Sequence, residues 1–67
     1  MIRIICNGKP REAHENAVVG DVLADIGLAL DSVVVECNGA ILKPEEYTAH
    51  KLADGDELEL IRFVGGG

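Results

Sequence analysis

The sequence has few basic residues for its 67 positions. Six lysines and arginines stand against twelve aspartates and glutamates, which gives a formal net charge of −6. Proteins that hold a nucleic-acid backbone do so through lysine and arginine, so this balance excludes nucleic acid as the main partner. One acidic cluster forms either a solvated face or a surface that attracts a basic partner: Asp54, Asp56, Glu57 and Glu59.

The sequence also lacks a long apolar run. No stretch approaches the ~20 residues that span a bilayer. Met1 leads directly into a strand-like pattern, without the charged and apolar regions of a signal peptide. We therefore expect a cytoplasmic protein with no membrane association, folded as a single domain over residues 1–67.

Potential metal ligands and disulfide partners are scarce. Cys6 and Cys37 lack the CxxC spacing of a zinc site and are too few for a disulfide framework. His14 and His50 have no set of histidine or cysteine ligands near them in the sequence. We expect two reduced, buried cysteines and no metal site.

The first part of the chain has the pattern of a hairpin followed by a helix. The alternating residues 2–6, "IRIIC", precede the turn dipeptide Asn7-Gly8, and the polar "KPREAHE" is a weak return strand whose Pro10 suits a sheet edge. Apolar residues then recur at helical spacing, with a glycine placed to cap the C-terminus: Val19, Val22, Leu23, Ile26 and Gly27.

The second part of the chain returns to strands. Residues 33–37, "VVVEC", end at Asn38-Gly39, and "AIL" begins a short partner strand. Pro44 opens a single helical turn, and residues 57–63 alternate again. A helix on one face of a mixed sheet of four to five strands is an α+β fold. The predicted core is Ile2, Ile4, Cys6, Val19, Val22, Leu23, Ile26, Val35, Cys37, Leu58 and Leu60, with Tyr47 anchoring its turn.

Four segments carry a resemblance that covers essentially the whole chain. They are "IRIICNGKPRE", "VGDVLADIGL", "VECNGAILKPEEY" and "LADGDELELIRFVGGG". In this order, ending on glycine, the chain resembles the ubiquitin-like β-grasp proteins, and more closely the sulfur-carrier proteins of thiamine (thiazole) biosynthesis, the ThiS family. The resemblance implies that the last strand runs between the first strand and "VVVEC", which sets Cys6 and Cys37 roughly 9–10 Å apart, too far for a disulfide.

The chain departs from the family pattern at three places. Val18 stands where the family has a threonine that caps the helix, so Asn16 or water is expected to satisfy the free N–H groups. Lys43-Pro44 replaces a Pro-Arg pair, and a third glycine extends the terminal pair. None of these changes removes the glycine terminus.

The resemblance implies that the carboxylate of Gly67 is the reacting group. An adenylating enzyme related to ubiquitin-activating enzymes uses ATP to activate this carboxylate, and sulfur from a cysteine persulfide replaces AMP to give a thiocarboxylate for thiazole synthase. The chain is then a protein co-substrate and not an enzyme, and it binds no cofactor itself. Residues that lack side chains pass through a narrow channel, which explains a flexible terminal segment of Val64, Gly65, Gly66 and Gly67.

Alternation along the strands predicts where a partner docks. Ile5, Ile61 and Phe63 point away from the helix and form an exposed apolar patch beside the terminal segment. Arg62 is expected to reach solvent at the end of its strand. Three other functions remain open: a carrier for another acceptor, such as the small subunit of molybdopterin synthase, a ubiquitin-like protein modifier, and a β-grasp binding module.

Overall fold

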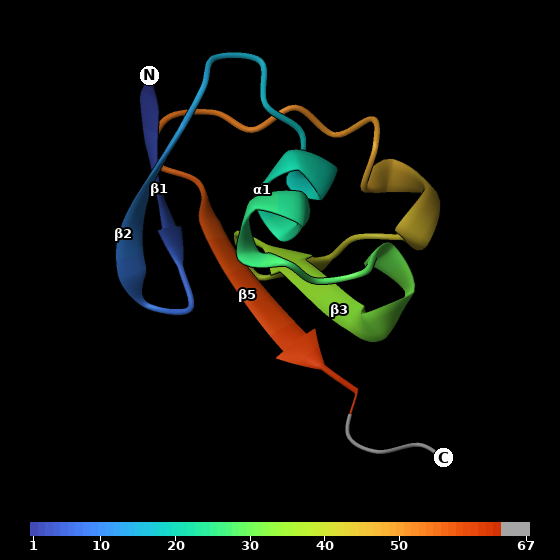
Figure 1. Cartoon of the computed structure of the whole chain (residues 1–67). Coiled ribbons are helices and arrows are strands. Elements are labelled where there is room, and N and C mark those ends of the chain that lie inside the picture. Colours follow the sequence, from blue (N-terminus) through green and yellow to red (C-terminus); the bar gives the residue numbers. More distant parts are fainter. Residues whose placement is uncertain (64–67) are drawn as a thin grey trace.

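The computed structural model describes residues 1–63 as a five-stranded mixed sheet with one helix against one face (Figure 1). The predicted flexible segment 64–67 lies outside the described residues. Strand order in the sheet is β2-β1-β5-β3-β4. The elements are β1 (Ile2–Cys6), β2 (Lys9–Ala13), α1 (Val19–Ile26), η1 (Leu30–Ser32), β3 (Val33–Cys37), β4 (Ala40–Ile41), η2 (Pro44–Glu46) and β5 (Glu57–Arg62).

The last strand, β5, is central in the sheet. It runs parallel to β1 and antiparallel to β3. Leu58 lies opposite Cys6 on one side and opposite Cys37 on the other, which confirms that one strand separates the two cysteines. Both cysteines are free and buried. The α+β fold predicted from the sequence is therefore confirmed.

Two Asn-Gly turns set the registers at the two ends of the sheet. Asn7 and Gly8 have φ of 51° and 81°, and Asn38 and Gly39 have φ of 53° and 87°. Two consecutive residues with positive φ make the turn whose twist matches that of paired antiparallel strands. These turns join β1 to β2 and β3 to β4, the two edge hairpins.

The helix begins without the capping side chain that the sequence led us to expect from Asn16. The N–H of Gly20 donates to the carbonyl of Tyr47 at 2.7 Å, and the N–H of Asp21 donates to the carbonyl of Val18 at 3.0 Å. Asp21 also accepts the N–H of Val18 at 2.9 Å. The expectation for Asn16 is therefore wrong, because a tertiary contact satisfies the N-terminus. Within residues 1–63 no helix is long and apolar enough to cross a membrane.

The core between α1 and the sheet largely matches the prediction. Ile4 is fully buried and Ile5 half-buried, so the register of β1 is as expected. Ile2 and Leu60 are only partly buried against the core. The prediction for Ile26 is wrong, because its side chain is 39% exposed. The last turn of α1 reaches the polar end of the β1–β2 hairpin, where Lys9 and Arg11 lie beside it.

Residues of the long connection between β4 and β5 complete the core. Leu42, Tyr47 and Leu52 are buried there, and the hydroxyl of Tyr47 donates to the carbonyl of Val33 at 3.2 Å. The anchoring role predicted for Tyr47 is confirmed. Leu42 and Leu52 were missed, because this segment has neither helical nor strand periodicity. Four other residues that the sequence did not predict also contribute to the core. They lie outside this connection and are Ala13, Ala17, Val33 and the half-buried Leu28.

Candidate functional site

The end of β5 is the part of the described structure nearest to the predicted reacting terminus. Glu57 accepts a hydrogen bond from Asn38, the residue after β3, and Phe63 donates to Ser32 before β3 at 3.0 Å. Leu58 and Leu60 instead bond to Asn7, the residue after β1. Backbone hydrogen bonds of β5 therefore alternate between its two neighbours, as the geometry of a strand requires.

Arg62 occupies a special place in this alternation. Its backbone N–H and C=O face the same side as those of Leu58 and Leu60, but β1 has already ended at Cys6. Because β1 turns away at Asn7-Gly8, β3 is the one strand beside the end of β5 within residues 1–63 (Figure 1). The Arg62 side chain is exposed, as the sequence predicted. No strand of the described part of the chain pairs with this edge of β5, and an unpaired strand edge is the feature to which a partner can add a strand.

An apolar patch covers the end of β5 on the sheet face away from α1. Ile61 is 50% exposed and Phe63 is 62% exposed. Val34 lies directly opposite Ile61 on β3 and is half-buried, and Ile41 of β4 is its diagonal neighbour and is 68% exposed. We call Val34, Ile41, Ile61 and Phe63 the outer-face patch.

Ile5 does not join this patch. It lies opposite Glu57, four residues before Ile61, which is a separation of roughly 13 Å along β5. Ile5 is half-buried next to Pro10, its partner on β2. The sequence grouped Ile5 with Ile61 because both point outward, but it did not give the offset between β1 and β5. The docking role of Ile5, Ile61 and Phe63 stays a prediction.

Acidic side chains lie beside the outer-face patch. Glu36 and Glu59 are directly opposite each other on β3 and β5, and Glu57 shares their face. Two like charges at opposed positions destabilise a sheet. The face therefore combines exposed apolar side chains with negative charge at a cost to the free domain.

The other acids of the predicted cluster have structural roles. Asp54 accepts the N–H of Arg3 at 2.8 Å. Asp56 accepts the N–H of Ala53 at 2.8 Å and the side-chain amide of Asn38 at 3.0 Å. These bonds hold the turn before β5 against the ends of β1 and β3. The prediction of a simple solvated or steering surface is thus incomplete for these two residues.

The two cysteines have different neighbours. Burial raises the pKa of both thiols. Arg11 partly offsets this rise at Cys6, whereas the negative charge of Asp56 adds to it at Cys37. The Nε2 atom of His50 lies 3.7 Å from Sγ of Cys37. The sequence missed this proximity, because thirteen positions separate the two residues and no motif connects them.

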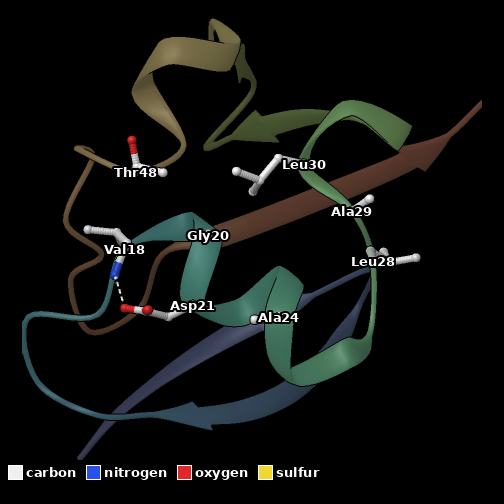
Figure 2. Close-up of a pocket in the computed structure, with 8 residues that line it drawn as sticks. All are labelled: Val18, Gly20, Asp21, Ala24, Leu28, Ala29, Leu30 and Thr48. Carbon is white, nitrogen blue, oxygen red and sulfur yellow. Dashed lines mark hydrogen bonds between the residues drawn. The ribbon is translucent and has the colours of Figure 1, made fainter.

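A shallow apolar groove lies between one side of α1, residues 28–30 and Thr48 (Figure 2). Asp21 is the one ionisable side chain in its lining, and it is already bonded to the N–H of Val18. The groove is therefore mainly apolar, and its one carboxylate is engaged at the start of α1. Its lining residues are Val18, Gly20, Asp21, Ala24, Leu28, Ala29, Leu30 and Thr48.

Known proteins match the chain almost from end to end. The sulfur carrier protein ThiS of Bacillus subtilis is 37% identical over 62 residues, which are 91% of this chain and 94% of that protein. A thiazole synthase of Magnetococcus marinus is 33% identical over 66 residues, or 98% of this chain. The chain spans only 20% of the length of that thiazole synthase.

The fold and the family profile agree with these matches. The crystal structure of the thiamine biosynthesis protein ThiS from Geobacter metallireducens superimposes with a TM-score of 0.81 at 35% identity, covering 98% of this chain and all of that one. The ThiS family profile matches residues 4–67, so the match includes the glycines that follow β5. The chain belongs to the ThiS family.

Proposed function

We propose that this protein is a sulfur carrier in thiamine biosynthesis. The observation that carries the proposal is the family match, which runs from β1 to Gly67 and therefore includes the whole glycine segment. The similarity to the carrier of Bacillus subtilis over nearly the full length of both chains supports the same function. The proposal requires Gly67 to be the last residue of the functional chain.

The reacting group in this proposal is the carboxylate of Gly67. A carboxylate is a poor acyl donor, so a partner enzyme first transfers AMP to it from ATP and releases pyrophosphate. The terminal sulfur of a cysteine persulfide then attacks the acyl carbon, and AMP leaves. Cleavage of the resulting S–S bond by a thiol leaves the thiocarboxylate. This chain contributes the acyl group, and the partners contribute the catalysis.

The contribution of the folded domain is delivery. Four residues, 64–67, extend at most ~3.3–3.6 Å each, so a fully extended segment reaches roughly 14 Å beyond Phe63. Three of the four lack side chains and fit a channel that excludes larger residues. The role of protein co-substrate therefore needs no catalytic side chain in residues 1–63.

The outer-face patch is the surface that we expect the adenylating enzyme to cover. It lies at the end of β5 from which the chain continues to Gly67, so an enzyme that binds the patch also has the terminus within reach of its active site. Ile61 and Phe63 supply apolar area, and Glu36, Glu57 and Glu59 favour a partner surface with lysine or arginine around an apolar centre. Thiazole synthase is the second expected partner, since the thiazole synthases of two bacteria contain a segment similar to this chain.

The intact mass of the protein tests the proposal. The purified chain is incubated with the adenylating enzyme, ATP and a cysteine desulfurase charged with cysteine. We expect a mass shift that corresponds to the replacement of one oxygen by sulfur. A variant with one bulky residue added after Gly67 is the control, because misplacing the reacting atoms by about 1 Å already costs ~10²-fold in rate.

Two results would contradict the proposal. If the extended variant acquires sulfur as fast as the parent, the carboxylate of Gly67 is not the reacting group. If the native protein is recovered joined to lysine side chains of other proteins, it is a protein modifier.

A further inference from the structure

Three side chains with metal-binding atoms meet beside the start of β5. They are Cys37 at the end of β3, His50 in the connection after η2, and Asp56 in the turn before β5. The Sγ, imidazole nitrogen and carboxylate oxygen atoms all lie within 4.8 Å of one another. Cys37 is buried, whereas His50 and Asp56 are half-buried, so an ion has access from the side of these two residues.

The spacing of these atoms fits a tetrahedral Zn²⁺ ion. Zinc bonds of about 2.3 Å to sulfur and about 2.0–2.1 Å to nitrogen, at a tetrahedral angle, hold the two ligand atoms about 3.6 Å apart. Sγ of Cys37 and Nε2 of His50 are separated by 3.7 Å. The pair needs almost no movement to bind an ion between them.

Hydrogen bonds already position the third ligand. Nδ2 of Asn38 donates to Oδ1 of Asp56 at 3.0 Å. Oδ1 of Asn38 accepts the N–H of Glu57 at 2.9 Å, which fixes the orientation of the Asn38 amide. The N–H of Ala53 donates to Oδ2 of Asp56 at 2.8 Å. Each carboxylate oxygen keeps a further lone pair for a cation. Such outer contacts fix the orientation of ligands in metal sites.

A nucleophilic role for this cluster fits the structure less well. Cys37 is buried and lies beside the carboxylate of Asp56, whereas reactive cysteines are partly exposed in electropositive surroundings. Asp56 bonds to Asn38 and Ala53, so its observed contacts do not include an orienting bond to His50. A divalent cation suits this cluster better, because it attracts both the thiolate and the carboxylate.

We propose that Cys37, His50 and Asp56 bind one Zn²⁺ ion, with a water molecule as the fourth ligand. The ion joins the long connection between β4 and β5 to the end of β3. It lies beside Leu58, five residues before Phe63, and hence roughly 16 Å along β5 from the end that leads to Gly67. The site is therefore separate from the proposed sulfur chemistry and stabilises the fold.

Cobalt absorption tests the site directly. The full chain, with any affinity tag removed and treated with a chelator, is titrated with Co²⁺ and then with Zn²⁺. We expect one equivalent of Co²⁺ to give the charge-transfer absorption of a cobalt–thiolate bond, and Zn²⁺ to abolish it. We expect Cys37→Ser to remove this absorption. His50→Gln and Asp56→Asn should each weaken Co²⁺ binding at least tenfold.

The chain supplies its own matched controls. Cys6 is also buried and also lies opposite Leu58, but it belongs to β1, and the cluster does not include it. Cys6→Ser should keep the cobalt–thiolate absorption, and His14→Gln should leave Co²⁺ affinity unchanged. Circular dichroism checks that each variant is folded. If Cys37→Ser does not fold, the half-buried His50→Gln variant decides the question.

Thermal unfolding gives a second readout. Zn²⁺ at 100 times its Kd should raise the Tm of the parent by roughly 10–20 °C. It should leave the Tm of His50→Gln nearly unchanged at the same concentration. The proposal is overturned if the parent shows no cobalt–thiolate absorption, if the Cys6 variant loses it as completely as the Cys37 variant, or if His50→Gln binds Co²⁺ as tightly as the parent.

Discussion

Tyr47 links the irregular half of the chain to both the helix and the sheet. Its ring is buried, its hydroxyl donates to Val33 on β3, and its carbonyl accepts the N–H of Gly20 on α1. The backbone contact has a steric requirement, since a Cβ atom on Gly20 would lie 3.2 Å from the same carbonyl. One residue of a short turn thus holds the helix N-terminus at a fixed distance from the sheet.

Comparing Tyr47→Phe with Tyr47→Ala distinguishes the contribution of the hydroxyl to stability from that of the ring. Tyr47→Phe leaves the carbonyl of Val33 without this donor, so we expect the free energy of unfolding to fall by about 0.5–1.5 kcal/mol. Tyr47→Ala should cost about 3–5 kcal/mol, because it also leaves a cavity. Urea unfolding followed by circular dichroism measures both. Equal losses for the two variants would mean that the ring contributes nothing beyond the hydroxyl.

The burial of individual residues was predictable where the sequence has the periodicity of a strand or a helix. Alternation placed Ile4 inside and Ile5 outside, and helical spacing placed Val22 and Leu23 in the core. The same helical spacing misplaced Ile26, because a period identifies a face of a helix but not the point at which the sheet beneath it ends. The contact of Cys37 with His50 was not predictable, since a single strand residue and an irregular segment meet there only after folding.

At the scale of elements, the end of β5 joins a binding surface to the chain terminus. The outer-face patch and the backbone of Arg62 are both available there, and the core lies on the other face. The order of strands and the Asn-Gly turns followed from sequence and resemblance. The offset between β1 and β5 did not follow from either, because no short turn connects parallel strands and sets their register.

Phe63→Ala tests the outer-face patch as a binding surface. The side chain is mostly exposed, so the free domain should keep its stability within about 0.5 kcal/mol. Binding to the adenylating enzyme should weaken by about 1–3 kcal/mol, measured by titration calorimetry. Ile26→Ala is the matched control, since Ile26 is also apolar and exposed but lies on α1. Unfolding of the Phe63 variant would place its side chain in the core and refute the docking role.

Glu36→Gln tests the opposed acids. Removing one of two facing negative charges should raise the free energy of unfolding by about 0.2–1 kcal/mol. The same change should slow association with a basic partner surface, most visibly at low ionic strength. Stopped-flow binding measures the rate, and Glu45→Gln, at an exposed position in η2, serves as the control. An unchanged association rate would show that these acids do not attract the adenylating enzyme.

At the scale of the whole molecule, the two buried thiols link stability to alkaline pH. Their pKa is raised in the folded state. Below the ordinary thiol pKa of about 8.5, both states hold the protons and stability does not depend on them. Above it, the unfolded chain loses protons that the folded chain keeps, so the free energy of unfolding should fall as pH rises.

A variant with both cysteines replaced by alanine isolates this effect. Its stability is lower at every pH, so the slopes are compared and not the absolute values. We expect urea unfolding between pH 8 and 10, with chelator and reductant present, to show a shallower decline for the variant than for the parent. Parallel curves would mean that the thiols titrate alike in the folded and unfolded states.

The central position of β5 has a consequence for synthesis on the ribosome. Ile5 pairs with Glu57 across a separation of fifty-two residues, and β3 also depends on β5 for its neighbour on that side. Until β5 has emerged from the exit tunnel, β1 is paired only with β2 and β3 only with β4, and nothing joins the two hairpins into one sheet. Pairings this distant in sequence form slowly. A nascent chain that stops at Asp56 should therefore remain open to chaperones and proteases, and the domain should acquire its protease resistance in one late step.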